Sequence, residues 1–204
     1  MRRLAILAAA FTLAACGVSK DEGIEGGGKV IGRTVTVYSL TNDPGGASRD
    51  FVDGEKLALS HAGGKAGELA VNFTSLDLGT GEAEQAESSR RAINDPQIIA
   101  AVVDATRVTV PLFNAAGILQ VVPSGDLGVA ENPQSLPSGK PTVGTPQGAA
   151  PSDFAERFEQ AYGRAPDASA ERGYRSMAAI IGAIESAGTA GVDRARVIDA
   201  YLGA

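Results

Sequence analysis

The sequence predicts an α/β domain: a doubly wound, mostly parallel sheet of four to five strands, with three helices closing the chain. Two observations predict this class. Short β-branched and apolar runs alternate with amphipathic helical patterns through short loops, the order of βαβ units with right-handed crossovers. One of these runs, residues 98–103, is apolar in every position, as expected of a strand that helices cover on both faces.

Each strand of the first half is followed by a turn and a helix. Residues 34–38 are β-branched or aromatic throughout, which favours a strand, and the run over 39–49 is turn-rich. Gly63 ends the first helix, and Pro96 ends the second because the residue before a proline disfavours helical backbone. Pro111 fits the third helix only in its first turn. The expected strands are 34–38, 69–76, 98–103 and 118–122, and the expected helices are 49–62, 82–93 and 108–116.

The regular alternation ends after Ser124. Residues 125–151 are rich in Pro, Gly and Ser and contain one candidate strand at 141–145. Three amphipathic helices follow, and their periodicity indicates packing on the sheet rather than membrane spans. The first is expected to be capped by Asp153, with Glu156 three residues further on. The second is expected to start after Asp167, and the third after Asp193.

The composition excludes several function classes. A formal net charge of −6 argues against nucleic acid, because phosphate binding needs a cationic face. The single cysteine and single histidine exclude an internal disulfide and clustered Cys or His metal sites, so neither metal nor cofactor is expected. Catalysis is not expected either, because no Gly-x-Ser-x-Gly elbow is present and the carboxylates are scattered. His61 is expected to face solvent in its charged form at a helix end.

The N-terminus has the layout of a targeting segment. Residues 1–15 carry two arginines, a short apolar stretch and small residues, and Cys16 follows directly. This arrangement resembles the lipobox of bacterial lipoproteins, which implies lipidation of Cys16 and anchoring at the extracytoplasmic face of the cell membrane. The alternative is an ordinary secretory signal with an incidental cysteine. Residues 16–33 are predicted to be a flexible tether, and residues 34–204 the folded domain.

Several segments, taken in order, resemble type I periplasmic binding proteins, and most of all the lipoprotein receptors of branched-chain amino-acid ABC transporters. The resemblance covers most of residues 34–204. It implies a receptor that delivers an amino acid or similar small polar solute to a transporter permease. The segments are Tyr38-Ser39-Leu40, Gly46-Ala47-Ser48-Arg49, Ala62-Gly63-Gly64-Lys65-Ala66-Gly67, Asn114-Ala115-Ala116-Gly117-Ile118 and Tyr162-Gly163-Arg164-Ala165-Pro166-Asp167.

One departure from this family dominates. Its receptors have two lobes that close over the ligand, whereas here the chain passes from Gly144-Thr145-Pro146 almost directly into the helix after Asp153. We therefore expect a single lobe, which supplies only one wall of a site. Two rival expectations follow: a surface lipoprotein that uses the uncovered face for a protein partner, or a degenerate relative without ligand. The uncovered face also makes a homodimer or a separate second-lobe partner possible.

Ligands of open α/β sheets lie beyond the carboxyl ends of the strands. By the resemblance, the loop after residues 98–103 would hold the two charges of an amino acid. Thr106 and Thr109 would supply hydroxyls, while Asp104 and Arg107, which depart from the family pattern, would pair with the ammonium and the carboxylate. The alternative is that Asp104 or Thr106 caps the next helix and Arg107 makes a surface ion pair.

Two further candidates stand on the first strand. Tyr38 and Ser39 are placed where the family has aromatic and hydroxyl contacts to the ligand, so the resemblance implies that they line the floor of the cleft. The alternative is that Tyr38 packs on its own sheet.

Overall fold

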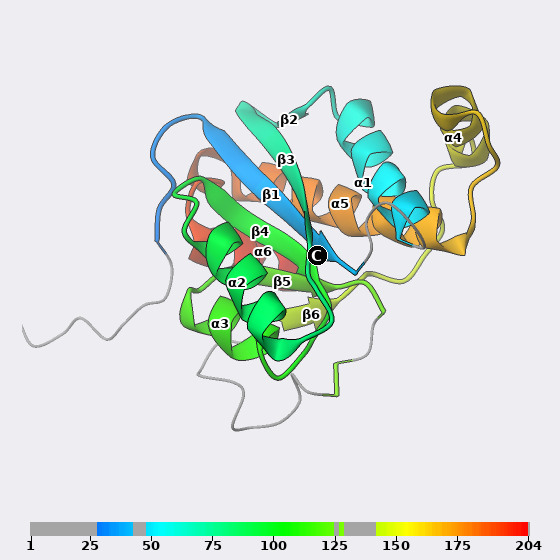
Figure 1. Ribbon diagram of the computed structural model, residues 1–204. Helices are drawn as coiled ribbons and strands as arrows, with labels where there is room; N and C mark the ends of the chain where they lie inside the picture. The colour runs from blue at the N-terminus through cyan, green and yellow to red at the C-terminus, as the bar shows by residue number, and fades with distance from the viewer. Residues whose placement is uncertain (1–27, 43–47, 125–126, 129–141, 204) are drawn as a thin grey trace, which may run out of the picture.

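The computed structural model describes residues 28–42, 48–124, 127–128 and 142–203. These residues form a sheet of six strands in the order β2-β3-β1-β4-β5-β6 (Figure 1). All neighbours pair in parallel except the short β2, which pairs with β3 in the antiparallel sense. The strands are β1 Thr34–Thr41, β2 Lys65–Ala66, β3 Leu69–Asp77, β4 Ile98–Val103, β5 Leu119–Val122 and β6 Thr142–Gly144. The predicted fold class is confirmed, and β2 is the unpredicted strand.

Helices cover both faces of this sheet. One apolar cluster lies between the sheet and α1, α4, α5 and α6, and a second lies between the sheet and the pair α2 and α3, which stand together at the front of Figure 1. The helices are α1 Arg49–His61, α2 Glu82–Ile93, α3 Thr109–Ala115, α4 Phe154–Tyr162, α5 Ala168–Ala187 and α6 Arg194–Leu202. The doubly wound arrangement is therefore confirmed.

Strand β1 is longer than its sequence pattern indicates. Residues 39–41, predicted as the start of a turn, continue the strand and pair with β3 as far as Thr41. The prediction was wrong because Ser39 and Thr41 are polar, and buried polar residues do not register in a hydrophobic pattern. The extension sets the carboxyl edge of β1 level with the ends of β3 and β4.

Helices α1 and α5 cross at two glycines. A Cβ on Gly54 would lie 2.0 Å from the carbonyl oxygen of Ala170, and a Cβ on Gly173 would lie 2.0 Å from that of Phe51. Glycine at both positions therefore lets the two backbones touch. This contact fixes α5, a late element of the chain, against the first helix of the domain.

The last part of the predicted tether is folded. Val30 is 3% exposed and its N–H donates to the carbonyl of Val192 at 2.8 Å, while Lys29 forms a β-bridge with Asp193. The tether prediction is therefore wrong for residues 28–33, because an apolar side chain can be buried against the turn before α6. The signal segment and Cys16 lie outside the described residues.

Two of the aspartates that precede the C-terminal helices act as caps. The carboxylate of Asp167 accepts hydrogen bonds from the N–H groups of Ser169 and Ala170, and Asp193 does the same for Ala195 and Arg196. The predicted cap at Asp153 was wrong, because Asp153 makes no such bond. Its carboxylate binds the guanidinium of Arg157 at 2.5 Å instead.

The prediction that His61 faces solvent was also wrong. The ring is half-buried, with Nδ1 lying 2.8 Å from the hydroxyl of Tyr174 and Nε2 lying 3.2 Å from Arg157 Nη1. The imidazole therefore links α1, α4 and α5.

Candidate functional site

The topology marks one place for a ligand. β1 and β4 are neighbours in the sheet, yet the helices that follow them lie on opposite faces: α1 on one face and α3 on the other. Such a topological switch point leaves an opening beyond the carboxyl ends of the two strands, where doubly wound proteins bind their ligands. We call this place the carboxyl-edge site. It comprises the end of β1 at Thr41 and the β4–α3 loop, residues 104–108.

The β4–α3 loop is held by two threonine hydroxyls. Thr109 Oγ1 donates to the carbonyl of Asp104 at 2.6 Å and accepts from the N–H of Thr106 at 2.9 Å. The hydroxyl of Thr106 accepts from the N–H of Thr109 at 3.1 Å and donates to Gln85 Oε1 at 3.0 Å. Both hydroxyls therefore fix the shape of the loop. Thr106 caps the start of α3, which is the alternative interpretation given above for this residue. The structure does not present them as free donors for a ligand.

A buried glutamine ties this loop to the two outer strands. Gln120 of β5 is fully buried, and its Nε2 donates to the carbonyls of Val103 at 3.3 Å and Asp104 at 3.2 Å. Its Oε1 accepts from the hydroxyl of Thr142 on β6 at 3.3 Å. The sequence analysis did not predict this network. A glutamine inside an otherwise apolar strand could have indicated it, because buried polar groups are nearly always hydrogen-bonded.

Asp104 and Arg107 are the charged groups of the site. Among the described residues, neither side chain makes a hydrogen bond or ion pair. Burial raises the pKa of the half-buried Asp104 carboxyl, whereas the Arg107 side chain is exposed. The loop thus presents one carboxylate and one guanidinium three residues apart, without partners in the part of the chain that the structure describes.

Tyr38 and Ser39 lie away from this pair. Tyr38 is packed in the cluster under α2 and α3, and its hydroxyl donates to Asp95 Oδ2 at 2.9 Å, just before the start of β4. The packing alternative therefore describes Tyr38, because its polar end points to the amino edge of the sheet. Ser39 is fully buried on the opposite face of β1, toward α1.

Glu55 of α1 is a residue that sequence reasoning missed. It is completely buried, and neither carboxylate oxygen makes a hydrogen bond. Burial raises its pKa well above the usual range, against smaller opposing effects of the nearby Ser39 hydroxyl and of the charge on Lys56. Its burial could have been predicted from the sequence. Residues 51, 55, 58 and 62 share one helix face, and the three other than Glu55 are apolar.

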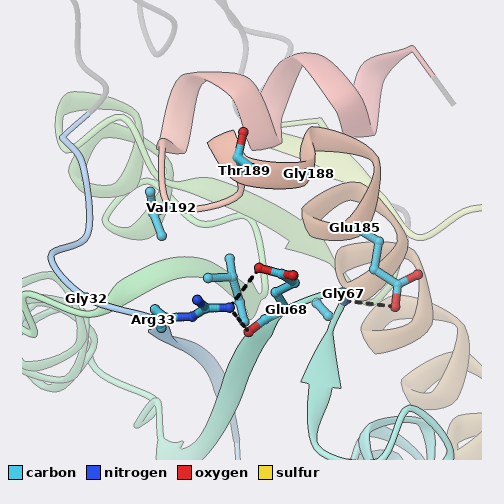
Figure 2. Close-up of a pocket in the computed structure, with 10 residues that line it drawn as sticks. Gly32, Arg33, Gly67, Glu68, Glu185, Gly188, Thr189 and Val192 are labelled. Carbon is cyan, nitrogen blue, oxygen red and sulfur yellow. Dashed lines mark hydrogen bonds and ion pairs between the residues drawn. The ribbon is translucent and has the colours of Figure 1, made fainter.

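Two hollows lie elsewhere on the molecule. One, of about 420 Å³, opens at the amino edge, where the exposed side chains of Arg33 and Glu68 pair at 2.7 Å and Glu185 accepts from the N–H of Gly67 at 3.3 Å (Figure 2). The other, of about 310 Å³, lies between α5 and the β6–α4 connection. Neither of these two hollows is lined by residues of the carboxyl-edge site.

Within the described ranges, no group of three or more His, Cys, Asp or Glu side chains is arranged to hold a metal ion. In the same residues, no helix combines the length and the apolar character needed to cross a bilayer. These two findings set no further limit on what the carboxyl-edge site holds.

The strand order, the switch point and the two helix layers define a single lobe of the type I periplasmic binding fold. The leucine-binding protein of Thermotoga maritima is similar with a TM-score of 0.63 and 13% identity, the alignment covering 82% of this chain and 87% of that one. A solute-binding protein of an R. palustris ABC transporter, in complex with benzoate, has a TM-score of 0.63 and 12% identity over 84% and 86%.

A third solved structure is a periplasmic ligand-binding protein of a branched-chain amino-acid ABC transporter from Burkholderia xenovorans. Its TM-score is 0.56 and its identity 14%, over 82% of each chain. At these identities the similarity establishes the fold. No protein-family model matches the sequence, and no curated protein does. The structural neighbours named here are solute-binding proteins of transporters and not enzymes.

Proposed function

We propose that this protein is a lipid-anchored, extracytoplasmic solute-binding protein of an ABC transporter, of the branched-chain or related amino-acid receptor type, shortened to one lobe. The observation that carries the proposal is the pair Asp104 and Arg107, which lies at the switch point of this fold and has no partner among the described residues. The neighbours support a small solute, since one is a leucine-binding protein and another holds benzoate. The periplasmic neighbour and the N-terminal targeting pattern support the location.

The two charges suit the two ends of an amino acid. The Asp104 carboxylate accepts from the ligand's ammonium group, and the Arg107 guanidinium offers a planar fork of donors to its carboxylate. The backbone between them is already held by Thr106, Thr109 and Gln120, so little loop ordering remains to be done on binding. In this proposal the threonines position the loop and do not contact the ligand.

A second wall must come from elsewhere. Among the described residues the chain forms one sheet, and only residues 145–153 separate β6 from α4. A tight small-molecule site usually buries about 70–90% of its ligand, more than one lobe covers. We propose that a second copy of this chain or a separate second-lobe protein closes over the carboxyl edge, with the transporter permease as the final partner.

Calorimetric titration tests solute binding. Leucine, isoleucine, valine, their amides and benzoate would each be titrated into the full chain. We expect heat for a free amino acid, with at least a tenfold loss of affinity in Asp104→Asn or Arg107→Gln, because a charged partner left unpaired costs about 1.5–3 kcal/mol. Glu87→Gln and Arg196→Gln, at exposed positions on α2 and α6, are matched controls. Absence of heat at millimolar ligand would overturn the receptor proposal.

The rival function, a surface lipoprotein that uses the uncovered face for a protein partner, is favoured by the exposed guanidinium of Arg107 at the carboxyl edge. Sedimentation velocity of the full chain, with and without the solutes, separates the two. Solute-dependent dimerisation supports the receptor with a second copy as its other wall. A dimer that forms equally without solute, and that Arg107→Glu dissolves, supports the rival.

The lipid anchor needs its own experiment. Labelling of growing cells with a radioactive fatty acid should mark the chain, and Cys16→Ser should abolish the label and release the protein from the membrane fraction. An unlabelled but exported chain would indicate an ordinary secretory signal.

A further inference from the structure

Four oxygen-bearing side chains on the α1 side of the sheet carry buried oxygens with no hydrogen-bond partner among the described residues. They are Glu55 of α1, Ser39 and Thr41 of β1, and Ser75 of β3. Glu55 and Ser39 are 0% exposed and Thr41 is 7% exposed, while the hydroxyl oxygen of Ser75 is buried. In native proteins buried polar atoms nearly always have a partner, so five orphaned oxygens in one place need a physical account.

The strand geometry places these oxygens together. Ser39 and Ser75 are directly paired in the parallel register of β1 and β3, so their side chains leave the sheet on the same face. Thr41 follows Ser39 by two residues and shares that face, which further down the strand carries Val35 and Val37 of the cluster beneath α1. Glu55 and Ser39 are both fully buried on this side of the sheet, Glu55 on the inner face of α1 and Ser39 on the strand beneath that helix.

The protein's own cations do not neutralise Glu55. Lys56, next in sequence, reaches Asp53 at 3.4 Å, and Arg49 reaches the other oxygen of Asp53 at 3.8 Å. Arg164 binds Asp53 at 2.7 Å and also Asp50. All three basic groups around the first half of α1 are thus directed at its other acids. A charged carboxylate buried without a counter-charge is strongly destabilising.

We propose that Glu55, Ser39, Thr41 and Ser75 form a buried site for a small monovalent cation of the sodium class. Carboxylate and hydroxyl oxygens are hard ligands, which favour hard ions over transition metals. A single carboxylate balances one positive charge, and a divalent ion would leave net charge in a buried place. The ion would join α1 to β1 and β3 just below the carboxyl edge. The site stands independently of the proposed solute.

Thermal unfolding of the full chain tests the site. Sodium chloride would replace choline chloride at constant ionic strength and pH 7.5. For a site half-filled near ~10 mM, the midpoint should rise by about 4 °C between ~1 and ~100 mM sodium, with a different response for lithium, potassium and caesium. Excess broadening of the ²³Na resonance by the wild-type chain is the second readout, which requires no variant.

Two variants identify the ligands. Glu55→Gln should abolish both the sodium-dependent shift and the line broadening, and Ser75→Ala should weaken them. Glu87→Gln, an exposed acid on α2, should leave both unchanged. If Glu55→Gln fails to fold, Ser75→Ala and the wild-type titration still decide. If the unfolding midpoint of the wild-type chain does not change with the identity or concentration of the cation, the proposal is overturned. This holds whether or not the midpoint then changes with pH, as it would for a protonated carboxyl group.

Discussion

Gly54 of α1 and the carbonyl oxygen of Ala170 on α5 are in direct backbone contact: a Cβ at position 54 would lie 2.0 Å from that oxygen. Gly173 and Phe51 repeat the contact in the opposite direction. Through this pair, the helix that follows β1 is fixed to the long C-terminal helix, so the late part of the chain holds α1 in place.

Gly54→Ala should therefore destabilise the domain, by about 3 kcal/mol or more, because the added methyl group forces two backbones apart. The free energy of unfolding from urea denaturation measures it. Gly182→Ala is the matched control: it lies inside α5, where an added Cβ meets nothing within 4 Å, and it should stabilise by about 0.5–1 kcal/mol. Equal effects of the two substitutions would contradict the close crossing.

Glu55 should make stability fall with rising pH. Because its pKa is raised in the folded state, the folded chain holds a proton that the unfolded chain releases above about pH 4.3. In choline buffer the stability contribution is thus full below that pH and is lost as the pH rises toward the folded pKa. Glu55→Gln should remove this slope and be the more stable protein at pH 8. Urea denaturation at pH 4–8 checks it, with Glu87→Gln as control; parallel slopes in wild type and Glu55→Gln would count against it.

Gln120 should be the costliest polar residue of β5 to remove. Gln120→Ala removes the amide that donates to the carbonyls of Val103 and Asp104 and leaves a cavity in the core, so we expect a loss of about 2–4 kcal/mol. Gln160→Ala, at an exposed position of α4, should change stability by less than about 0.5 kcal/mol. If the two variants unfold at the same urea concentration, the network does not hold the site.

The two aspartates before α4 and α5 should differ. Asp167→Ala removes a side chain that caps two N–H groups and should cost about 1 kcal/mol, whereas Asp153→Ala removes a half-exposed ion pair and should cost less than half of that. Amide hydrogen exchange at Ser169 and Ala170 should speed up in Asp167→Ala alone. Faster amide exchange at the start of α4 in Asp153→Ala would instead support the prediction that Asp153 caps this helix.

Elements with periodic apolar residues were predictable from the sequence. The bounds of α2 and β4 agree with prediction, because Pro96 stops the helix and the strand is apolar throughout. β2 was not predictable, since two residues carry no period, and the end of β1 was hidden by Ser39 and Thr41. Polar residues inside an element were thus the main source of error.

The candidate site was predictable in its place but not in its parts. The rule about the carboxyl ends of strands located the loop at 104–107, and the assignments of Asp104 and Arg107 stay predictions. The direction of the Tyr38 side chain depends on Asp95, which is 57 residues away in the sequence. The burial of Glu55 depends on which face of α1 packs on the sheet. Such facts are properties of packing, which a linear pattern does not carry.

The folded segment at Lys29 and Val30 fixes where the chain enters the domain, at the edge where β1 starts. A lipid at Cys16 would therefore be attached on the side opposite Asp104 and Arg107. The eight residues of β1 span about 26 Å between these two edges, so an anchored chain could keep its two charges clear of the bilayer and accessible to a solute or to a covering protein.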